Sequence, residues 1–171
     1  MGTPPDAITV RRARTPDVKT IRSFVDAYAP DRKLLNKPTV TLYEDVQEFW
    51  VATDADVGVV GCGALHVMWE DLAEIRTLAV APAMRRHGIG HLILDHLLAV
   101  AREIGVSRLF CLTFEVDFFA AHGFVEIDGT PVEPELFAEL LRSYDEGIAE
   151  FLDLDRVKPN TLGNTRMILQ L

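Results

Sequence analysis

The sequence has few cysteines, little positive charge and no long hydrophobic run. Its two cysteines are too few for a disulfide framework and form no Cys-x-x-Cys motif. Lysine and arginine total 17 against 26 acidic residues, and the net charge of −9 argues against binding to a nucleic-acid backbone. No apolar run reaches the roughly 18 residues of a membrane span, and the N-terminus has no apolar signal region. We therefore expect a protein of the reducing cytoplasm that does not enter membranes.

The remaining composition is that of a globular domain. Of the 171 residues, 49% are hydrophobic and 25% are charged, which predicts a single domain over residues 1–171 with a loose, proline-containing start at residues 1–6. Cys62 and Cys111 lie inside apolar, strand-like runs, where a free cysteine behaves as a small buried hydrophobic residue. An acyl-cysteine intermediate is the less favoured alternative, because buried thiols are usually inert.

Strand-like and helix-like patterns alternate along the chain. Strand patterns occupy residues 7–13, 56–70, 72–80, 106–113 and 164–171, and helical patterns occupy residues 16–29, 90–104 and 132–154. Residues 40–55 pass from a short helix into a strand at Phe49. Thr15 is expected to cap the first helix, and Gly105 to end the long one. Residues 115–127 predict a short helix, a glycine stop and a strand. This order predicts an α+β (α/β three-layer) fold, with parallel strands on either side of the long helix.

Residues 78–98 pass from a strand through a basic, glycine-containing loop into an amphipathic helix. A helix N-terminus leaves four N–H groups unpaired and carries partial positive charge. Arg85 and Arg86 add full charges, and Gly88 and Gly90 allow a ligand to approach the backbone. The Arg-x-x-Gly-x-Gly spacing is neither a Walker A motif nor the dinucleotide GxGxxG motif. On pattern alone it indicates either an anion site or a solvated basic turn.

The sequence around this loop resembles a known family. "LAVAPAMRRHGIG" is similar to the acetyl-CoA signature of the GNAT acetyltransferases, and "FFAAHGF" resembles their next helix. "LLNKPTVTLYEDVQEFWVA", "VGCGALHV", "EIRTLAV" and "NTRMILQL" resemble the acetyltransferase domain of N-acetylglutamate synthases, in their short, stand-alone form. The resemblance implies a central, mixed, twisted sheet of six to seven strands flanked by helices.

The same resemblance implies an activity and an acetyl-CoA site. The activity is transfer of acetyl from acetyl-CoA to the α-amine of glutamate or glutamine by direct attack, the first step of arginine biosynthesis. We expect a homodimer and no metal. Pantetheine is expected on the main chain of Leu78 and Val80. The pyrophosphate is expected on the backbone of Arg85, Arg86, His87, Gly88, Ile89, Gly90 and His91.

Candidates for binding the substrate carboxylate lie on a strand and in a loop. Barring a bulge, alternation places Glu74, Arg76, Leu78 and Val80 on one face of their strand. A guanidinium matches a carboxylate in bidentate geometry, so Arg76 is a candidate, with a surface ion pair as the alternative. The resemblance adds Lys37, with Lys33 as a substitute.

The resemblance also points to the C-terminal strand. Thr165 corresponds to a substrate-contacting serine of the family. Gly163 stands where the family usually has an arginine, which leaves the side-chain specificity of the site open. Asn164 and Arg166 are the candidate replacements for that arginine.

The chemistry requires a base and, in many family members, an acid. Glu74 is the candidate base, because a partly buried carboxylate can accept a proton from the amine through water; His66 is the alternative. Many GNAT enzymes place a tyrosine on the helix after the fifth strand to protonate the thiolate. This chain has Phe118 and Phe119 there. Either the thiolate leaves unaided, or another group assists; the candidates are Tyr144 and Thr113.

Two other functions remain open at this point. A GNAT enzyme can act on another small amine or on a protein N-terminus, and an acidic chain attracts cationic amines. The absent tyrosine also permits a non-catalytic, acyl-CoA-binding regulatory module. The basic trio Lys33, Lys37 and Arg76 favours a carboxylated amine instead.

Overall fold

The computed structural model describes residues 7–30, 37–161 and 163–171. Within these residues it contains a seven-stranded mixed sheet with the order β1-β2-β3-β4-β5-β7-β6. The prediction of six to seven strands is therefore confirmed. The expectation for residues 1–6 lies outside the described residues. The chain divides into two compact units, one formed by the chain up to His66 with Ile75–Ile104, the other by Val67–Glu74 with Gly105–Leu171.

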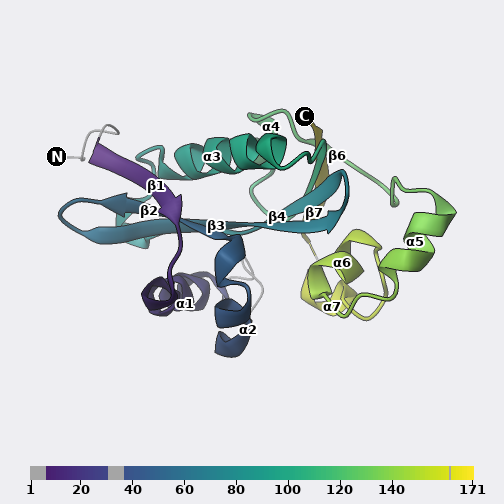
Figure 1. Cartoon of the computed structure of the whole chain (residues 1–171), viewed down its shortest axis with the longest axis horizontal. Helices are drawn as coiled ribbons and strands as arrows, with labels where there is room; N and C mark the ends of the chain where they lie inside the picture. The colour runs from purple at the N-terminus through teal and green to yellow at the C-terminus, as the bar shows by residue number, and fades with distance from the viewer. Residues whose placement is uncertain (1–6, 31–36, 162) are drawn as a thin grey trace. The chain divides into compact units, whose positions relative to one another are not determined.

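The first unit holds the antiparallel end of the sheet and the longest helix. Figure 1 shows β1, β2 and β3 as neighbouring strands, and each pairs antiparallel with the next. The elements of this unit are β1 (Ile8–Arg12), α1 (Val18–Tyr28), α2 (Thr39–Glu44), β2 (Phe49–Asp54), most of β3 (Gly58–Trp69), the end of β4 (Leu72–Val80) and α3 (Ile89–Glu103). Short 3-10 helices occur at η2 (Thr15–Asp17), η3 (Val46–Glu48) and η4 (Pro82–Met84).

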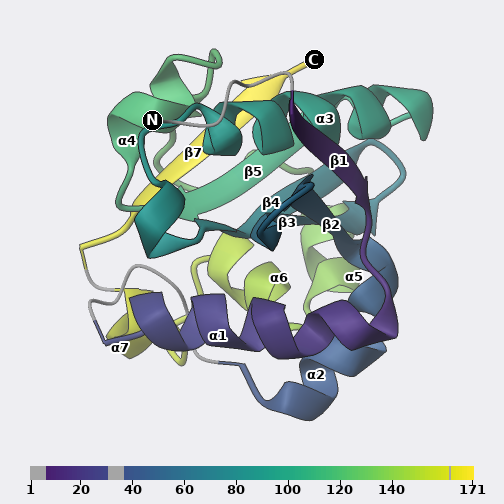
Figure 2. The ribbon, with the colours of Figure 1, turned by 90° about the vertical axis from the view of Figure 1, so that its left-hand side faces the viewer.

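Helices cover both faces of the sheet in this unit (Figure 2). Helix α3 buries apolar side chains at helical spacing, and two glycines of β3 let it approach closely. A Cβ on Gly61 would lie 2.8 Å from Ile93 Cδ1, and one on Gly63 would lie 2.9 Å from Ile93 Cγ2. On the opposite face, α1 and α2 pack against the sheet through a core formed by Val18, Ile21, Phe24, Leu42, Phe49, Val51, Cys62 and Ala64.

The start of α1 differs from the prediction. The chain first makes the 3-10 turn η2, so α1 begins at Val18 and Thr15 does not cap it. Asp17 organises this turn, because its Oδ2 accepts a hydrogen bond from the Arg14 amide at 2.7 Å. Arg11 binds the same carboxylate at 2.7 Å, and this bond lowers the pKa of Asp17.

The second unit holds the parallel strand pair and the C-terminal helices. Strand β4 runs parallel to β5, which confirms the predicted crossover of parallel strands, and β7 is antiparallel to β5 and β6. Phe110 and Phe151 meet edge to face at 5.2 Å in the core of this unit. Its further elements are β5 (Arg108–Thr113), α4 (Val116–Ala120), β6 (Val125–Glu126), α5 (Pro134–Leu140), α6 (Glu146–Phe151), α7 (Lys158–Thr161) and β7 (Thr165–Gln170). No helix in the described part of the chain combines the length and apolar character needed to cross a membrane.

Candidate active site

The loop between β4 and α3 presents the N-terminus of a 15-residue helix to solvent. Gly88 is the N-cap with φ +76°, and residues 85–88 are exposed. The first helical hydrogen bond runs from the Leu92 amide to the Gly88 carbonyl at 3.0 Å, so the amides just before Leu92 project from the helix end. No acidic residue lies in the first turn. This donor set fits an anion such as a diphosphate.

A tyrosine that the sequence analysis did not identify connects this loop to β4. The Tyr28 hydroxyl, at the end of α1, donates to the Val80 carbonyl at 2.5 Å. The Arg85 guanidinium lies 6.0 Å from the centre of the Tyr28 ring. His87 Nδ1 approaches the Arg85 carbonyl at 2.8 Å. Tyr28 therefore fixes the main chain of Val80 beside the arginine-bearing loop.

Strand β4 does not keep the alternation that the sequence predicted. Thr77 has φ +54°, in the left-handed region, so the order of side chains changes there. A Cβ placed on Gly63 would meet Ile93 and Leu97 of α3, and it would lie 3.1 Å from Leu78 Cδ1. Leu78 therefore faces α3. Arg76, before the break, acts electrostatically on Asp45 at the end of α2. The shared face expected for Glu74, Arg76, Leu78 and Val80 was conditional on a regular strand, and the left-handed Thr77 interrupts the strand between the first pair and the second.

Charged groups of both signs collect in the first unit. Burial raises the pKa of Asp45, and the charge of Glu48 raises it further. Lys37, Arg76 and His66 act on the pKa of Asp45 in the opposite direction. The predicted residues Lys37, Arg76 and His66 therefore belong to one electrostatic cluster; Lys33 lies outside the described residues.

Two carboxylates of this cluster were missed by the sequence analysis. Asp45 and Glu48 lie at the ends of short helical turns before β2, where charged residues usually indicate only a solvated connection. His66 Nδ1 lies 2.7 Å from Glu48 Oε1, and their side chains are 17% and 27% exposed. A helical-spacing or motif search does not reveal this pair, because the two residues are brought together by β2 and β3.

Glu74 is buried in the second unit and has a thiol nearby. It pairs in register with Phe110 of β5 and is 4% exposed. Burial, and then the charge of Glu74, raise the pKa of the Cys111 thiol. Burial also raises the pKa of Cys62 to about 12. Both thiols are therefore protonated near neutral pH, which disfavours an acyl-cysteine step.

The predicted residues of the C-terminal strand have different surroundings. Asn164 Oδ1 is buried and has no hydrogen-bond partner among the described residues. Thr165 is half-buried and pairs in register with Thr113. The Arg166 guanidinium donates to the carbonyls of Gly129 and Phe151, and burial lowers its pKa. Both terminal nitrogens of Arg166 are therefore hydrogen-bonded to main-chain carbonyls of this unit.

Gly163, which departs from the family pattern, adopts a backbone conformation that favours glycine. Gly163 has φ +89°, and a Cβ there would lie 3.3 Å from Phe114 Cε1. An arginine at this position would be strained by both features. The two candidate acids of the sequence analysis differ sharply in exposure: Tyr144 is 99% exposed, whereas Thr113 is 7% exposed and its hydroxyl accepts from the Glu115 amide at 2.8 Å.

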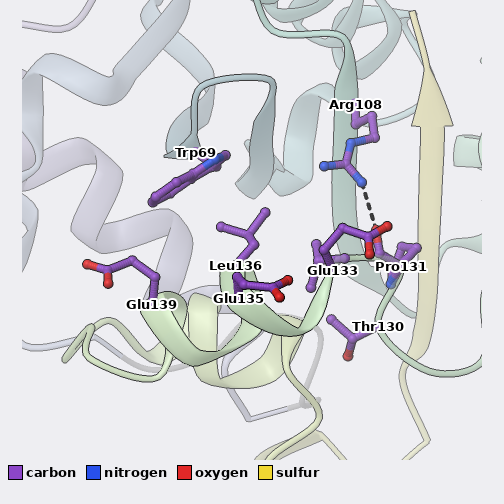
Figure 3. Close-up of a pocket in the computed structure, with 9 residues that line it drawn as sticks. Trp69, Arg108, Thr130, Pro131, Glu133, Glu135, Leu136 and Glu139 are labelled. Atoms are coloured by element: carbon purple, nitrogen blue, oxygen red, sulfur yellow. Dashed lines mark hydrogen bonds between the residues drawn. The ribbon is translucent and has the colours of Figure 1, made fainter.

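A cavity of about 850 Å³ lies in the second unit and contains none of the predicted site residues. Figure 3 shows its carboxylates, Glu133, Glu135 and Glu139, with Arg108 bound to the Pro131 carbonyl at 2.7 Å. Trp69 forms another part of its lining. Within the described ranges, no group of three or more histidine, cysteine or acidic side chains is arranged to hold a metal ion.

Comparisons with known proteins agree on one family. The acetyltransferase (GNAT) family matches residues 19–127. An amino-acid acetyltransferase from Mycobacterium tuberculosis is 64% identical over 164 residues, which cover 95% of this chain and 94% of the relative. The crystal structure of Rv2747 from M. tuberculosis in complex with CoA and NLQ has a TM-score of 0.92 at 64% identity, covering 95% of this chain and 99% of that one.

A larger enzyme shares the fold. N-acetylglutamate synthase from Neisseria gonorrhoeae, complexed with coenzyme A and N-acetyl-glutamate, has a TM-score of 0.76 at 24% identity. The match covers 96% of this chain and 35% of that chain, so this chain corresponds in fold to about a third of the larger protein.

Proposed function

Because this chain belongs to the acetyltransferase (GNAT) family, we propose that it transfers acetyl from acetyl-CoA to the α-amine of L-glutamine or L-glutamate. The observation that carries the proposal is 64% identity to an amino-acid acetyltransferase over nearly the full length of both chains. The predicted family and fold are confirmed, and the chain is an acyltransferase that uses acetyl-CoA. A thiol-release assay with free amino acids, polyamines and peptides tests the substrate class.

The donors around α3 suit the pyrophosphate of acetyl-CoA. We place it on the backbone of residues 85–91, where the helix end and two exposed arginines supply positive charge. Pantetheine is placed on the main chain of Leu78 and Val80. Tyr28 supports this placement, because its bond to the Val80 carbonyl fixes that part of β4.

The acetyl transfer is a direct attack. The amine nitrogen bonds to the thioester carbon, the carbon–sulfur bond breaks, CoA leaves as a thiolate, and the nitrogen releases its second proton to solvent to give the neutral amide. Before attack the ammonium group loses one proton, which we assign to Glu74 through water, with His66 as the alternative base. Phe118 and Phe119 supply no acid on α4. A thiol with an ordinary pKa near 8.5 is a good leaving group, so the thiolate departs unaided.

Arg76 and Lys37 are assigned to the substrate carboxylate. Arg76→Ala is expected to raise the amino-acid KM about tenfold or more, because a charge-assisted pair contributes about 1.5–3 kcal/mol. The acetyl-CoA KM should change little. Steady-state kinetics with each substrate varied in turn measures both values. Arg102→Ala, on the exposed face of α3, is the control for loss of an arginine. A rise confined to the acetyl-CoA KM would contradict the assignment.

Glutamine is expected to be at least as good a substrate as glutamate. A γ-carboxylate requires a cation, whereas a γ-amide requires a donor and an acceptor. Asn164 Oδ1 is a buried acceptor in need of a donor, and the Arg166 guanidinium is bound to two carbonyls. We therefore expect kcat/KM for glutamine to equal or exceed that for glutamate in parallel kinetic assays. A strong preference for glutamate would mean that Arg166, Lys158 or Lys33 supplies the cation.

The proposal also includes a pathway, a cellular compartment and an oligomeric state. We place the reaction at the start of arginine biosynthesis, in the cytoplasm, and expect a homodimer. A polyamine or a protein N-terminus is the second candidate acceptor. The mixture of cations and carboxylates around Asp45 favours a free amino acid instead. CoA binding without thiol release from any amine in the assay would favour the regulatory module.

A further inference from the structure

Glu48 has one satisfied carboxylate oxygen and one unsatisfied oxygen. Oε1 lies 2.7 Å from His66 Nδ1. Oε2 is buried and has no hydrogen-bond partner among the described residues. Native proteins rarely leave a buried carboxylate oxygen without a donor, because its lost hydration is not replaced. The position of Oε2 therefore calls for a donor that a ligand or a water molecule supplies.

The surroundings of Glu48 carry both signs of charge. Its charge adds to the effect of burial in raising the pKa of Asp45, and Lys37 and Arg76 act on Asp45 in the opposite sense. A free amino acid at neutral pH carries a carboxylate and an ammonium group on one carbon atom. A cluster with adjacent cations and carboxylates is complementary to such a zwitterion, because each substrate charge meets an opposite one.

Glu48 is better fixed for this task than Asp45. The hydrogen bond to His66 fixes one oxygen, so the carboxylate plane and the second oxygen are held as well. His66 lies on β3, and Glu48 directly precedes β2, which pairs with β3 through Phe49 and Ala64. A binding group mounted on paired strands loses little conformational freedom when its ligand arrives.

We infer that Glu48 binds the α-ammonium group of the amino-acid substrate through Oε2. This inference rests on the proposed function and adds a residue to it. The ammonium donates a hydrogen bond to Oε2 while Lys37 and Arg76 receive the carboxylate. No covalent bond forms or breaks at Glu48, and removal of the proton before attack remains with the base.

The test compares L-glutamine with glutaramate, the same molecule without its α-amine. Binding of each to the enzyme–CoA complex is measured by calorimetry, so that no turnover interferes. Glu48→Gln replaces the carboxylate by a neutral amide of the same shape. It should weaken glutamine binding about tenfold or more and leave glutaramate and acetyl-CoA binding unchanged. Glu44→Gln, the same change at an exposed position of α2, should behave as the unmodified protein.

Three results separate the alternatives. Unchanged glutamine binding in Glu48→Gln overturns the inference and assigns Oε2 to a bound water molecule. Equal weakening of both ligands also overturns it, because Glu48 would then support the site as a whole and not bind the α-ammonium group. If Glu48→Gln fails to fold, Glu48→Asp replaces it and should weaken glutamine selectively. Failure of the proposed function itself is distinct: the unmodified protein would then release no thiol with any amino acid.

Discussion

Replacing Glu74 with glutamine is expected to lower kcat by at least about a hundredfold while acetyl-CoA binding stays unchanged. Removal of a general base typically costs 10²- to 10⁴-fold in rate. Glu74 is 4% exposed, and glutamine preserves its shape, so the change removes the proposed base without opening a cavity. Glu74 lies on β4, where it pairs in register with Phe110 of β5.

The dependence of kcat on pH identifies this role. Without a base, the reaction relies on amine that bulk solvent has deprotonated, so kcat of Glu74→Gln should rise steeply with pH where the unmodified enzyme levels off. Stopped-time thiol assays across the pH range measure the two profiles. Glu70→Gln, at an exposed position of the turn before β4, is the matched control. Near-normal kcat at neutral pH would transfer the role to His66 or to solvent.

The sequence was sufficient for elements whose patterns are long and regular. The apolar spacing of α3 and the extended patterns of β3 and β4 predict their positions to within one or two residues, because each buries a continuous face. The position of β7 between β5 and β6 was not predicted. Strand order depends on contacts between distant segments, and nothing within residues 164–171 specifies the neighbouring strands.

The loop that carries arginine and glycine before α3 was predictable, and the carboxylates Asp45 and Glu48 were not. Glycine and arginine at fixed spacing before a helix have a local physical meaning, so the loop is visible in the sequence. Glu48 and His66 are 18 positions apart in the chain, and they meet only when β2 and β3 pair. Neither residue therefore has a local signature in the sequence. Thr77 is a third case: a left-handed residue that is not glycine has no sequence signature, and it changed which side chains share a face.

Gly88→Val is expected to weaken acetyl-CoA binding about a hundredfold. Gly88 has φ +76°, a conformation that a β-branched residue rarely adopts, so valine should displace the backbone at the N-terminus of α3. Its side chain would also stand where we propose that the pyrophosphate approaches the amides. Each charge-assisted hydrogen bond contributes about 1.5–3 kcal/mol, so loss of two costs at least about 3 kcal/mol, which corresponds to roughly a hundredfold in Kd.

Gly129→Val separates loss of the site from general strain. Gly129 has φ +77°, and a Cβ at either glycine would meet no atom within 4 Å, so the two substitutions impose similar backbone strain. Thermal unfolding should therefore show a similar loss of stability in both variants. Calorimetric titration with acetyl-CoA should show weakened binding in Gly88→Val alone. Equal acetyl-CoA affinity in Gly88→Val and the unmodified protein would mean that the pyrophosphate binds elsewhere, since the amides of residues 88–90 would then be dispensable.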